Sequence, residues 1–119
     1  MKRIILDTNI MLSKAKIDIF SELARICDFN YEVCVLDKTL NELKNKANSK
    51  LALELIKSKS VQIIKTENNK SVDELLLDLA EADKDMIVVT QDAELKRELK
   101  KKGIKIITIR QNQYLMAEN

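Results

Sequence analysis

The sequence predicts an α/β protein, a three-layer α/β/α arrangement with a central parallel sheet of about five strands. Two observations support this. Short runs rich in Ile, Val and Leu recur along the chain, and stretches with apolar residues at helical spacing separate them. The length of 119 residues suits one domain, which we expect to span 1–119, with residues 111–119 as a C-terminal tail.

The first half of the chain begins with an expected strand, and helices and strands then alternate. Ile4 to Leu6 is a short apolar run typical of a buried strand. The next helix shows its inner face as Ile17, Phe20, Leu23, Ala24 and Cys27. A second strand is expected over 31–36, and helices are expected over about 38–46 and 49–57. The apolar face of the latter helix is predicted to consist of Leu51, Leu55 and Ile56.

The second half continues the alternation. A third strand is expected over 61–65, followed by a polar loop over 67–70 and a helix with Val72, Leu75, Leu76, Leu79 and Ala80 inward. Residues 86–89 form a continuous apolar run, as expected of a central parallel strand. A charged helix with Leu95 and Leu99 inward ends at Gly103, and a fifth strand follows over 104–109. The pattern assigns no structure to residues 111–119.

Composition limits the chemistry. The net charge is +2, and charged residues make up 34% of the chain, so this is not a generally basic nucleic-acid binder. No run reaches the roughly 18 apolar residues that span a bilayer, and the apolar start is stopped by Asp7 before it is long enough for a signal peptide. We therefore expect a cytoplasmic protein with no membrane partner.

Several common catalytic sites are excluded by missing residues. Without histidine the chain cannot supply a Ser-His-Asp or Cys-His site, and with one glycine, Gly103, it cannot form a P-loop or a dinucleotide fingerprint. Cys27 and Cys34 alone cannot complete a zinc site. We expect reduced thiols, with a disulfide as the alternative.

Two carboxylates follow strands that are predicted to be central. Asp7 ends the first apolar run, and Asp92 comes just after the fourth, with Thr90 beside it. Because the carboxyl ends of parallel strands meet at one edge of a sheet, both acids are expected at that edge. The alternative is structural, because Asp7 also suits a turn or a cap, and Asp92 suits the N-cap of the helix that begins at Ala93.

Two further carboxylates lie at predicted helix starts. Glu42 follows the second strand, and Asp73 lies before the fourth. Each has a structural alternative, because Thr39 with Glu42 and Ser71 with Glu74 have the spacing of a capping box, and Asp73 in a first turn suits the helix dipole. Gathered in one cleft, these acids would repel one another, and a divalent cation removes that cost. Such a site can activate water for attack on a phosphodiester.

These segments resemble the PIN-domain family, in particular its small archaeal and bacterial nucleases. The matching motifs are Ile-Leu-Asp7-Thr8-Asn9, Glu42 in Leu-Asn-Glu-Leu, Asp73 in Ser-Val-Asp-Glu, and Thr90-Gln91-Asp92 after Val-Val. The resemblance extends from Ile4 to about Ile109 in order and spacing. It implies a parallel sheet with flanking helices and a site that binds Mg²⁺ or Mn²⁺.

The resemblance also assigns roles to these residues. It implies that Asp7, Glu42, Asp73 and Asp92 are catalytic, that Asp7, Asp73 and Asp92 bind the metal, and that Thr8, Asn9 and Thr90 are supporting polar residues. Glu74 and Asp78 are the alternatives for the position of Asp73. The implied activity is that of a metal-dependent endoribonuclease in RNA processing, such as rRNA maturation, in which water attacks the phosphodiester and leaves a 5′-phosphate. The alternatives are a VapC-like toxin of a toxin–antitoxin pair and a non-catalytic RNA- or protein-binding module.

RNA must be held by basic residues, because the acids repel it. Lys14 and Lys38 are expected near the acidic edge and are the candidates for substrate binding. The last helix is also rich in lysine, but Glu94 and Glu98 interrupt it, which favours a solvated charged face. The family resemblance adds three kinds of partner to consider, namely a second copy of the chain, an antitoxin and a ribosome-assembly protein.

Overall fold

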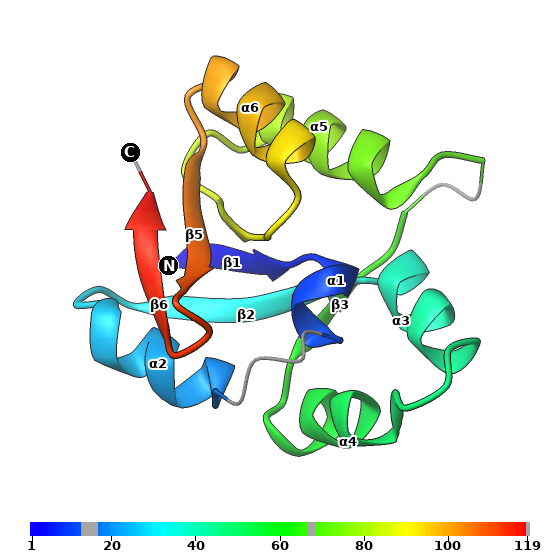
Figure 1. Cartoon of the computed structure of the whole chain (residues 1–119). Helices are drawn as coiled ribbons and strands as arrows, with labels where there is room; N and C mark the ends of the chain where they lie inside the picture. The colour runs from blue at the N-terminus through cyan, green and yellow to red at the C-terminus, as the bar shows by residue number, and fades with distance from the viewer. Residues whose placement is uncertain (13–16, 67–68, 119) are drawn as a thin grey trace.

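The computed structural model describes residues 1–12, 17–66 and 69–118, which contain a six-stranded sheet (Figure 1). Its strands are β1 (Lys2–Leu6), β2 (Tyr31–Leu36), β3 (Gln62–Ile64), β4 (Ile87–Val89), β5 (Lys105–Arg110) and β6 (Tyr114–Glu118). Their order across the sheet is β3-β2-β1-β4-β5-β6. All neighbours pair in parallel except β5 and β6, which are antiparallel. The five predicted strands are confirmed, and β1 and β4 lie side by side at the centre.

Helices cover both faces of the sheet, as predicted (Figure 1). They are α1 (Thr8–Met11), α2 (Ile19–Ile26), α3 (Asp37–Lys44), α4 (Lys50–Ser58), α5 (Val72–Ala82) and α6 (Ala93–Lys101). Alternate side chains of β1 point to opposite faces. Ile4 packs in an apolar cluster with Leu23 of α2 and Ala52 of α4. Ile5 packs on the other side with Leu76 of α5 and Leu99 of α6.

The predicted inner face of α4 is wrong in one position. Leu51 is 67% exposed, whereas Ala52 and Ile56 are buried and Leu55 is half-buried. Ala52 and Ile56 lie four residues apart and share a face, and Leu51 is rotated from Ala52 by about 100°. Counting apolar residues in this helix therefore misplaced the inner face by about one position.

The C-terminal tail contains a strand that the sequence did not indicate. A tight turn precedes β6, in which Gln111 and Asn112 both have a φ of 54° and the Gln113 N–H bonds to the Arg110 carbonyl at 3.0 Å. Leu115 of β6 is buried in the core. Its backbone also bonds to α2, since its carbonyl accepts from the Arg25 guanidinium at 3.0 Å and its N–H donates to Glu22 at 2.9 Å. This tail is therefore an integral edge of the sheet.

The two cysteines are free thiols, as expected. Cys34 is buried in the core, and burial raises the pKa of its thiol to about 11. Burial also raises the pKa of Cys27. Both therefore stay protonated at neutral pH and act as small apolar residues. None of the helices in the described ranges has the length and apolar character needed to cross a bilayer.

Candidate functional site

Asp7 lies at the carboxyl end of β1, next to the end of β4. Its backbone N–H bonds to the Val89 carbonyl at 3.0 Å, which extends the pairing of the two strands by one residue. The carboxylate is 4% exposed and holds two hydrogen bonds, from the Thr8 N–H to Oδ1 at 2.8 Å and from the Thr90 hydroxyl to Oδ2 at 2.7 Å. The same Thr90 oxygen accepts the Asp92 N–H at 3.1 Å. Asp7 and Asp92 therefore lie at the same edge, joined through one fully buried hydroxyl.

Asp92 also performs the structural role that the sequence offered as an alternative. Its Oδ1 accepts the Leu95 N–H at 3.0 Å, which caps the N-terminus of α6. The cap fixes the orientation of the carboxylate and leaves its second oxygen available. Capping and metal binding are thus compatible at this residue.

Glu42 is not part of a capping box. The N-cap position of α3 is Leu36, which makes no side-chain cap, and Thr39 lies inside the helix and is fully buried. The Thr8 hydroxyl lies 2.9 Å from Glu42 Oε1 and 3.2 Å from the Thr39 hydroxyl. A hydroxyl has one proton, and an ionised carboxylate can only accept, so Thr8 donates to Glu42 and accepts from Thr39. This contact draws Glu42 of α3 toward the residue that follows Asp7.

Asp73 lies in the first turn of α5, where the predicted cap is present. The Ser71 hydroxyl accepts the Glu74 N–H at 3.2 Å and lies 3.2 Å from Glu74 Oε1. Glu74 therefore serves the helix start, and the neighbouring Asp73 is exposed. Because Glu74 is engaged at the helix start and Asp73 is not, Asp73 is the better candidate for the acidic site.

The electrostatics connect Asp7 with two other acids. Burial is the main cause of its raised pKa, and the charges of Asp92 and Glu42 raise the pKa further. The hydrogen bonds from Thr90 and Thr8 lower it and offset part of that rise. The charges that act on this buried carboxylate are thus both negative.

Asp73 responds to the same group of acids. Although the residue as a whole is exposed, desolvation of its carboxyl group raises the pKa of Asp73, and the charges of Asp7, Asp92, Glu42 and Glu94 add to the effect in that order. The four acids predicted from the sequence therefore lie within electrostatic reach of one another. Glu94 is a fifth acid in this group, and the sequence suggested it only as a surface charge. Its position two residues after Asp92, in the first turn of α6, could have indicated that it lies near the other acids.

The donor set of these acids fits a hard divalent cation. All the groups are oxygen donors, which Mg²⁺ and Mn²⁺ prefer, and a cation would relieve the negative charge that raises the pKa of Asp7 and Asp73. Within the described ranges, no three acidic or cysteine side chains are already arranged as ligands around one point. Glu42 and Asp73 are both exposed, and Glu42 is held by the Thr8 hydroxyl.

The remaining residues predicted from the sequence are Asn9, Lys38 and Lys14, and they differ in their surroundings. Asn9 is exposed on α1. The Lys38 ammonium donates to the Lys70 carbonyl and so ties α3 to the segment before α5. Lys38 also lines a small polar groove together with Asp37, Asn41, Glu42 and Asn45. Lys14 lies outside the described residues.

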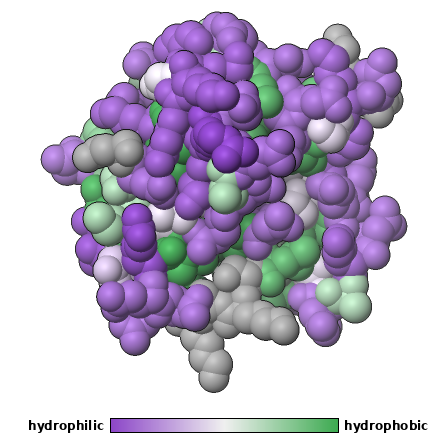
Figure 2. Space-filling model, turned by 45° about the horizontal axis from the view of Figure 1, so that its top comes forward, coloured by the Kyte–Doolittle hydropathy of each residue, from purple (hydrophilic) through white to green (hydrophobic). Residues whose placement is uncertain are grey.

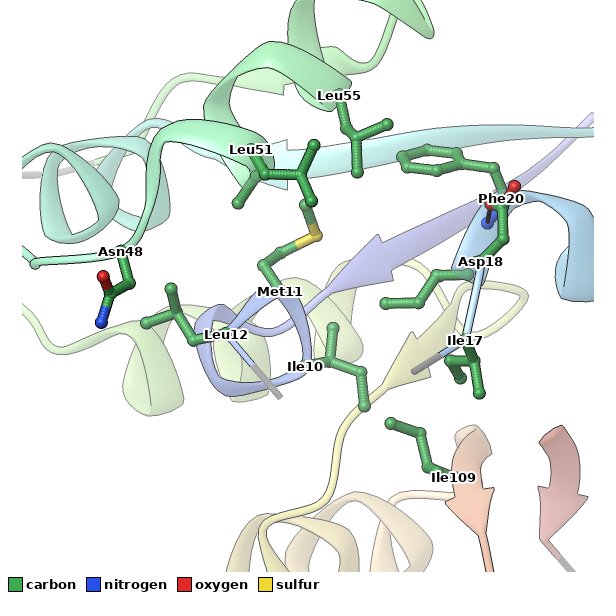
Figure 3. A pocket seen from close by; sticks show the side chains of 12 residues that line it. Ile10, Met11, Leu12, Ile17, Asp18, Phe20, Asn48, Leu51, Leu55 and Ile109 are labelled. Atoms are coloured by element: carbon green, nitrogen blue, oxygen red, sulfur yellow. Dashed lines mark hydrogen bonds between the residues drawn. The ribbon is translucent and has the colours of Figure 1, made fainter. Parts of the chain in front are cut away.

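An apolar pocket lies on another side of α1 (Figure 3). Met11 of α1 points toward Leu51 of α4, Phe20 is drawn beside Leu55, and Ile10 points toward Ile109 (Figure 3). Hydrophobic surface is also visible in the lower part of Figure 2, in an otherwise mostly hydrophilic face. Asp18 and Asn48 are the polar residues among those that line the pocket, so it offers no group of acids for hydrolysis.

Comparison with known proteins identifies the family and agrees with the fold. Residues 4–112 match the family described as PIN-like domain. The chain is 31% identical over 125 residues to Ribonuclease VapC4 of Methanocaldococcus jannaschii, covering 96% of this chain and 95% of that protein. It also superposes on the solved structure of the PIN domain endonuclease Utp24 with a TM-score of 0.85 and 25% identity, covering 98% of this chain and 90% of that one. The chain belongs to the PIN-like domain family.

Proposed function

We propose that this protein is an endoribonuclease that hydrolyses RNA phosphodiester bonds with Mg²⁺ or Mn²⁺. The main support is the acidic edge, where desolvation and the charges of neighbouring carboxylates raise the pKa values of buried Asp7 and of Asp73. Uncompensated negative charge of this kind is characteristic of a cation site. The names of the two relatives, a ribonuclease and an endonuclease, support the choice of reaction.

Some of these residues would hold the metal, and others would orient the metal ligands or the attacking water. Asp7, Asp73 and Asp92 would hold the metal, which when bound lowers the pKa of water and stabilises charge on the phosphate. Thr8 and Thr90 fix the Asp7 carboxylate through two hydrogen bonds. Glu42, restrained by the Thr8 hydroxyl, is the candidate for orienting the attacking water. Asn9, which is exposed in the first turn of α1, would add a polar contact.

A cleavage assay tests this proposal. We expect single-stranded RNA to be cleaved by the wild type with Mn²⁺, and the rate to fall on the order of 100-fold or more in Asp7→Asn and Asp92→Asn. Asp78→Asn is the matched control, since Asp78 is an exposed acid of α5 that pairs with Lys70 at 2.7 Å. Equal cleavage by all four proteins would mean that the site is assigned wrongly or that the activity is a contaminant.

The pathway is a separate question with two candidates. RNA processing, such as rRNA maturation, is the first. A VapC-like toxin is the second, and the 31% identity to a protein named Ribonuclease VapC4 favours it. Inducible expression distinguishes them, because a toxin arrests growth in a manner that requires Asp7, whereas a processing enzyme supports growth. A non-catalytic binding module is the remaining explanation if the purified protein neither cleaves RNA nor is stabilised by Mn²⁺.

Location and partners follow from these candidates. Cytoplasmic RNA is the proposed substrate in both. A toxin requires an antitoxin, a processing enzyme requires a ribosome-assembly or similar partner, and a homodimer is compatible with either.

A further inference from the structure

A basic groove lies between α6 and β6. It extends from Ala93, the residue after Asp92, toward the opposite edge of the sheet, where Glu118 pairs with Ile106 of β5. Four basic side chains and one acidic side chain line it, namely Lys96, Arg97, Lys100, Lys101 and Glu118, together with Ala93. We propose that this groove is the track for the phosphates of the RNA substrate, and that Glu118 occupies it when RNA is absent. This inference rests on the proposed function and deepens it.

The geometry of α6 connects the groove with the acids. Asp92, Lys96 and Lys100 follow one another at intervals of four residues, so they share one face of the helix. At a rise of about 1.5 Å per residue, Lys100 lies about 12 Å beyond Asp92 along the helix. Arg97 and Lys101 form a second, parallel row. One helix thus carries an acid of the site at its start and cations further along, where RNA leaving the site meets them.

The basic side chains of α6 can supply the phosphate binding that the acids cannot. An acidic cluster repels RNA, so phosphate binding has to come from basic residues just outside it. Arg97 has no ion-pair partner in the part of the chain that the structure describes, and it is exposed. Lys38, a candidate cation near Glu42 in the part of the chain that the structure describes, is already bound to a backbone carbonyl. The α6 groove is therefore the better placed of the two basic regions.

Glu118 occupies the groove as a phosphate would. Its two carboxylate oxygens bind separate lysines, Lys96 at 3.3 Å and Lys100 at 2.7 Å. The side chains of Lys96 and Glu118 are only 19% and 18% exposed, so the pair is held partly out of water. A phosphate offers the same charge and oxygen acceptors, and can replace the carboxylate. Glu118 thus keeps both lysines in position, and RNA has to displace its carboxylate in order to bind them.

Removing this competitor provides a direct test. Binding of a fluorescein-labelled single-stranded RNA is measured by anisotropy in EDTA, where hydrolysis is absent. We expect Glu118→Gln to tighten binding roughly two- to fivefold, since it frees two lysines and removes one negative charge. Glu81→Gln is the matched control, because Glu81 also pairs with two lysines, Lys84 and Lys102, but does not line the groove. Equal affinity of these two variants would overturn the role of Glu118.

Removing the cations tests the track itself. We expect Arg97→Gln and Lys100→Gln each to weaken RNA binding and to lower the slope of log affinity against log salt by roughly 0.7 per lost phosphate contact. Lys50→Gln and Lys57→Gln on α4 serve as controls, because neither residue lines the groove. Melting temperatures confirm that each variant is folded. An unchanged affinity and slope in the α6 variants would refute the track.

The outcomes separate this inference from the proposed function. Normal cleavage by the wild type with unaltered RNA affinity in the α6 variants leaves the function intact and refutes the track. Groove-dependent RNA binding without any cleavage supports the track and refutes the catalytic proposal. If the α6 variants lose affinity for poly-glutamate and not for RNA, the groove takes an acidic protein segment, and the assignment to RNA is wrong.

Discussion

Thr90 is the side chain on which the geometry of the site most depends. Its buried hydroxyl donates to Asp7 and accepts from the Asp92 backbone, so one oxygen positions both acids. We expect Thr90→Val to lower the free energy of unfolding by about 1–3 kcal/mol, because buried polar groups lose their partner. We also expect it to weaken Mn²⁺ binding by roughly 10- to 100-fold, as loss of a residue that orients a ligand does. Urea denaturation and calorimetric titration measure the two effects.

Thr108→Val is the matched control for Thr90. Thr108 is also a buried threonine near a strand end, but its hydroxyl bonds to Gln91 and touches none of the acids. A stability loss in both variants is compatible with the role of Thr90. An equal loss of Mn²⁺ affinity in both would contradict it, because the effect would then come from the strands and not from Asp7.

The sequence was sufficient to place Asp7 and Asp92, and less informative for Glu42. Asp7 and Asp92 follow short apolar strands, and a parallel sheet brings such ends together. Glu42 could not be distinguished from a capping-box residue, because the spacing of Thr39 and Glu42 is the same in both cases. The decisive fact is its bond to Thr8, which lies 34 positions away in the chain. Contacts at that separation depend on how α1 and α3 pack.

Among the strands, β6 shows where a local pattern stops being informative. A tight turn with positive φ at both central residues normally carries Asn-Gly or Gly there, whereas this turn uses Gln111 and Asn112. Leu115 is the one residue of β6 that is fully in the core, so the strand shows too little alternation to recognise. The other strands were predicted because continuous apolar runs mark buried parallel strands.

The contribution of β6 to stability can be measured with two neighbouring substitutions. We expect Leu115→Ala to lower the free energy of unfolding by about 2–5 kcal/mol, because it leaves a cavity in the core. Met116→Ala, at a side chain 46% exposed on the same strand, should change it by about 0.5 kcal/mol or less. Urea unfolding measures both. Equal losses would show that β6 does not depend on the core contact of Leu115.

In the protein as a whole, the distribution of charge matters more than its sum. The net charge of +2 is a sum that includes an acidic edge, to which Asp92 at the start of α6 belongs, and a basic groove, which lies along the same helix. The fold produces this separation because parallel strands bring acids together at one end, while the exposed face of α6 carries cations further along. A polyanion bound to the cations therefore has its backbone directed toward the acids.

The acidic edge should be detectable in the pH dependence of folding. Asp7 and Asp73 have raised pKa values in the folded state, so their stabilising contribution is complete below the ordinary value of 3.8 and is lost as pH rises through the raised pKa. Carboxylates with lowered pKa values, such as Asp18 and Asp37, act in the opposite direction. The total curve therefore mixes both effects, and a difference between variants is needed to isolate Asp7.

Comparison of wild type with Asp7→Asn provides that difference. We expect the free energy of unfolding of wild type to fall relative to the variant as pH rises from below 3.8 toward neutrality, because only wild type then carries the buried charge. Mn²⁺ at neutral pH should reverse the fall in wild type and leave the variant unchanged, since the cation binds the folded state through Asp7. Urea titrations over this pH range, with and without Mn²⁺, measure both effects, and Asp78→Asn should follow wild type. A difference that is constant with pH, or equal stabilisation of Asp7→Asn by Mn²⁺, would exclude Asp7 as the buried acid that holds the metal.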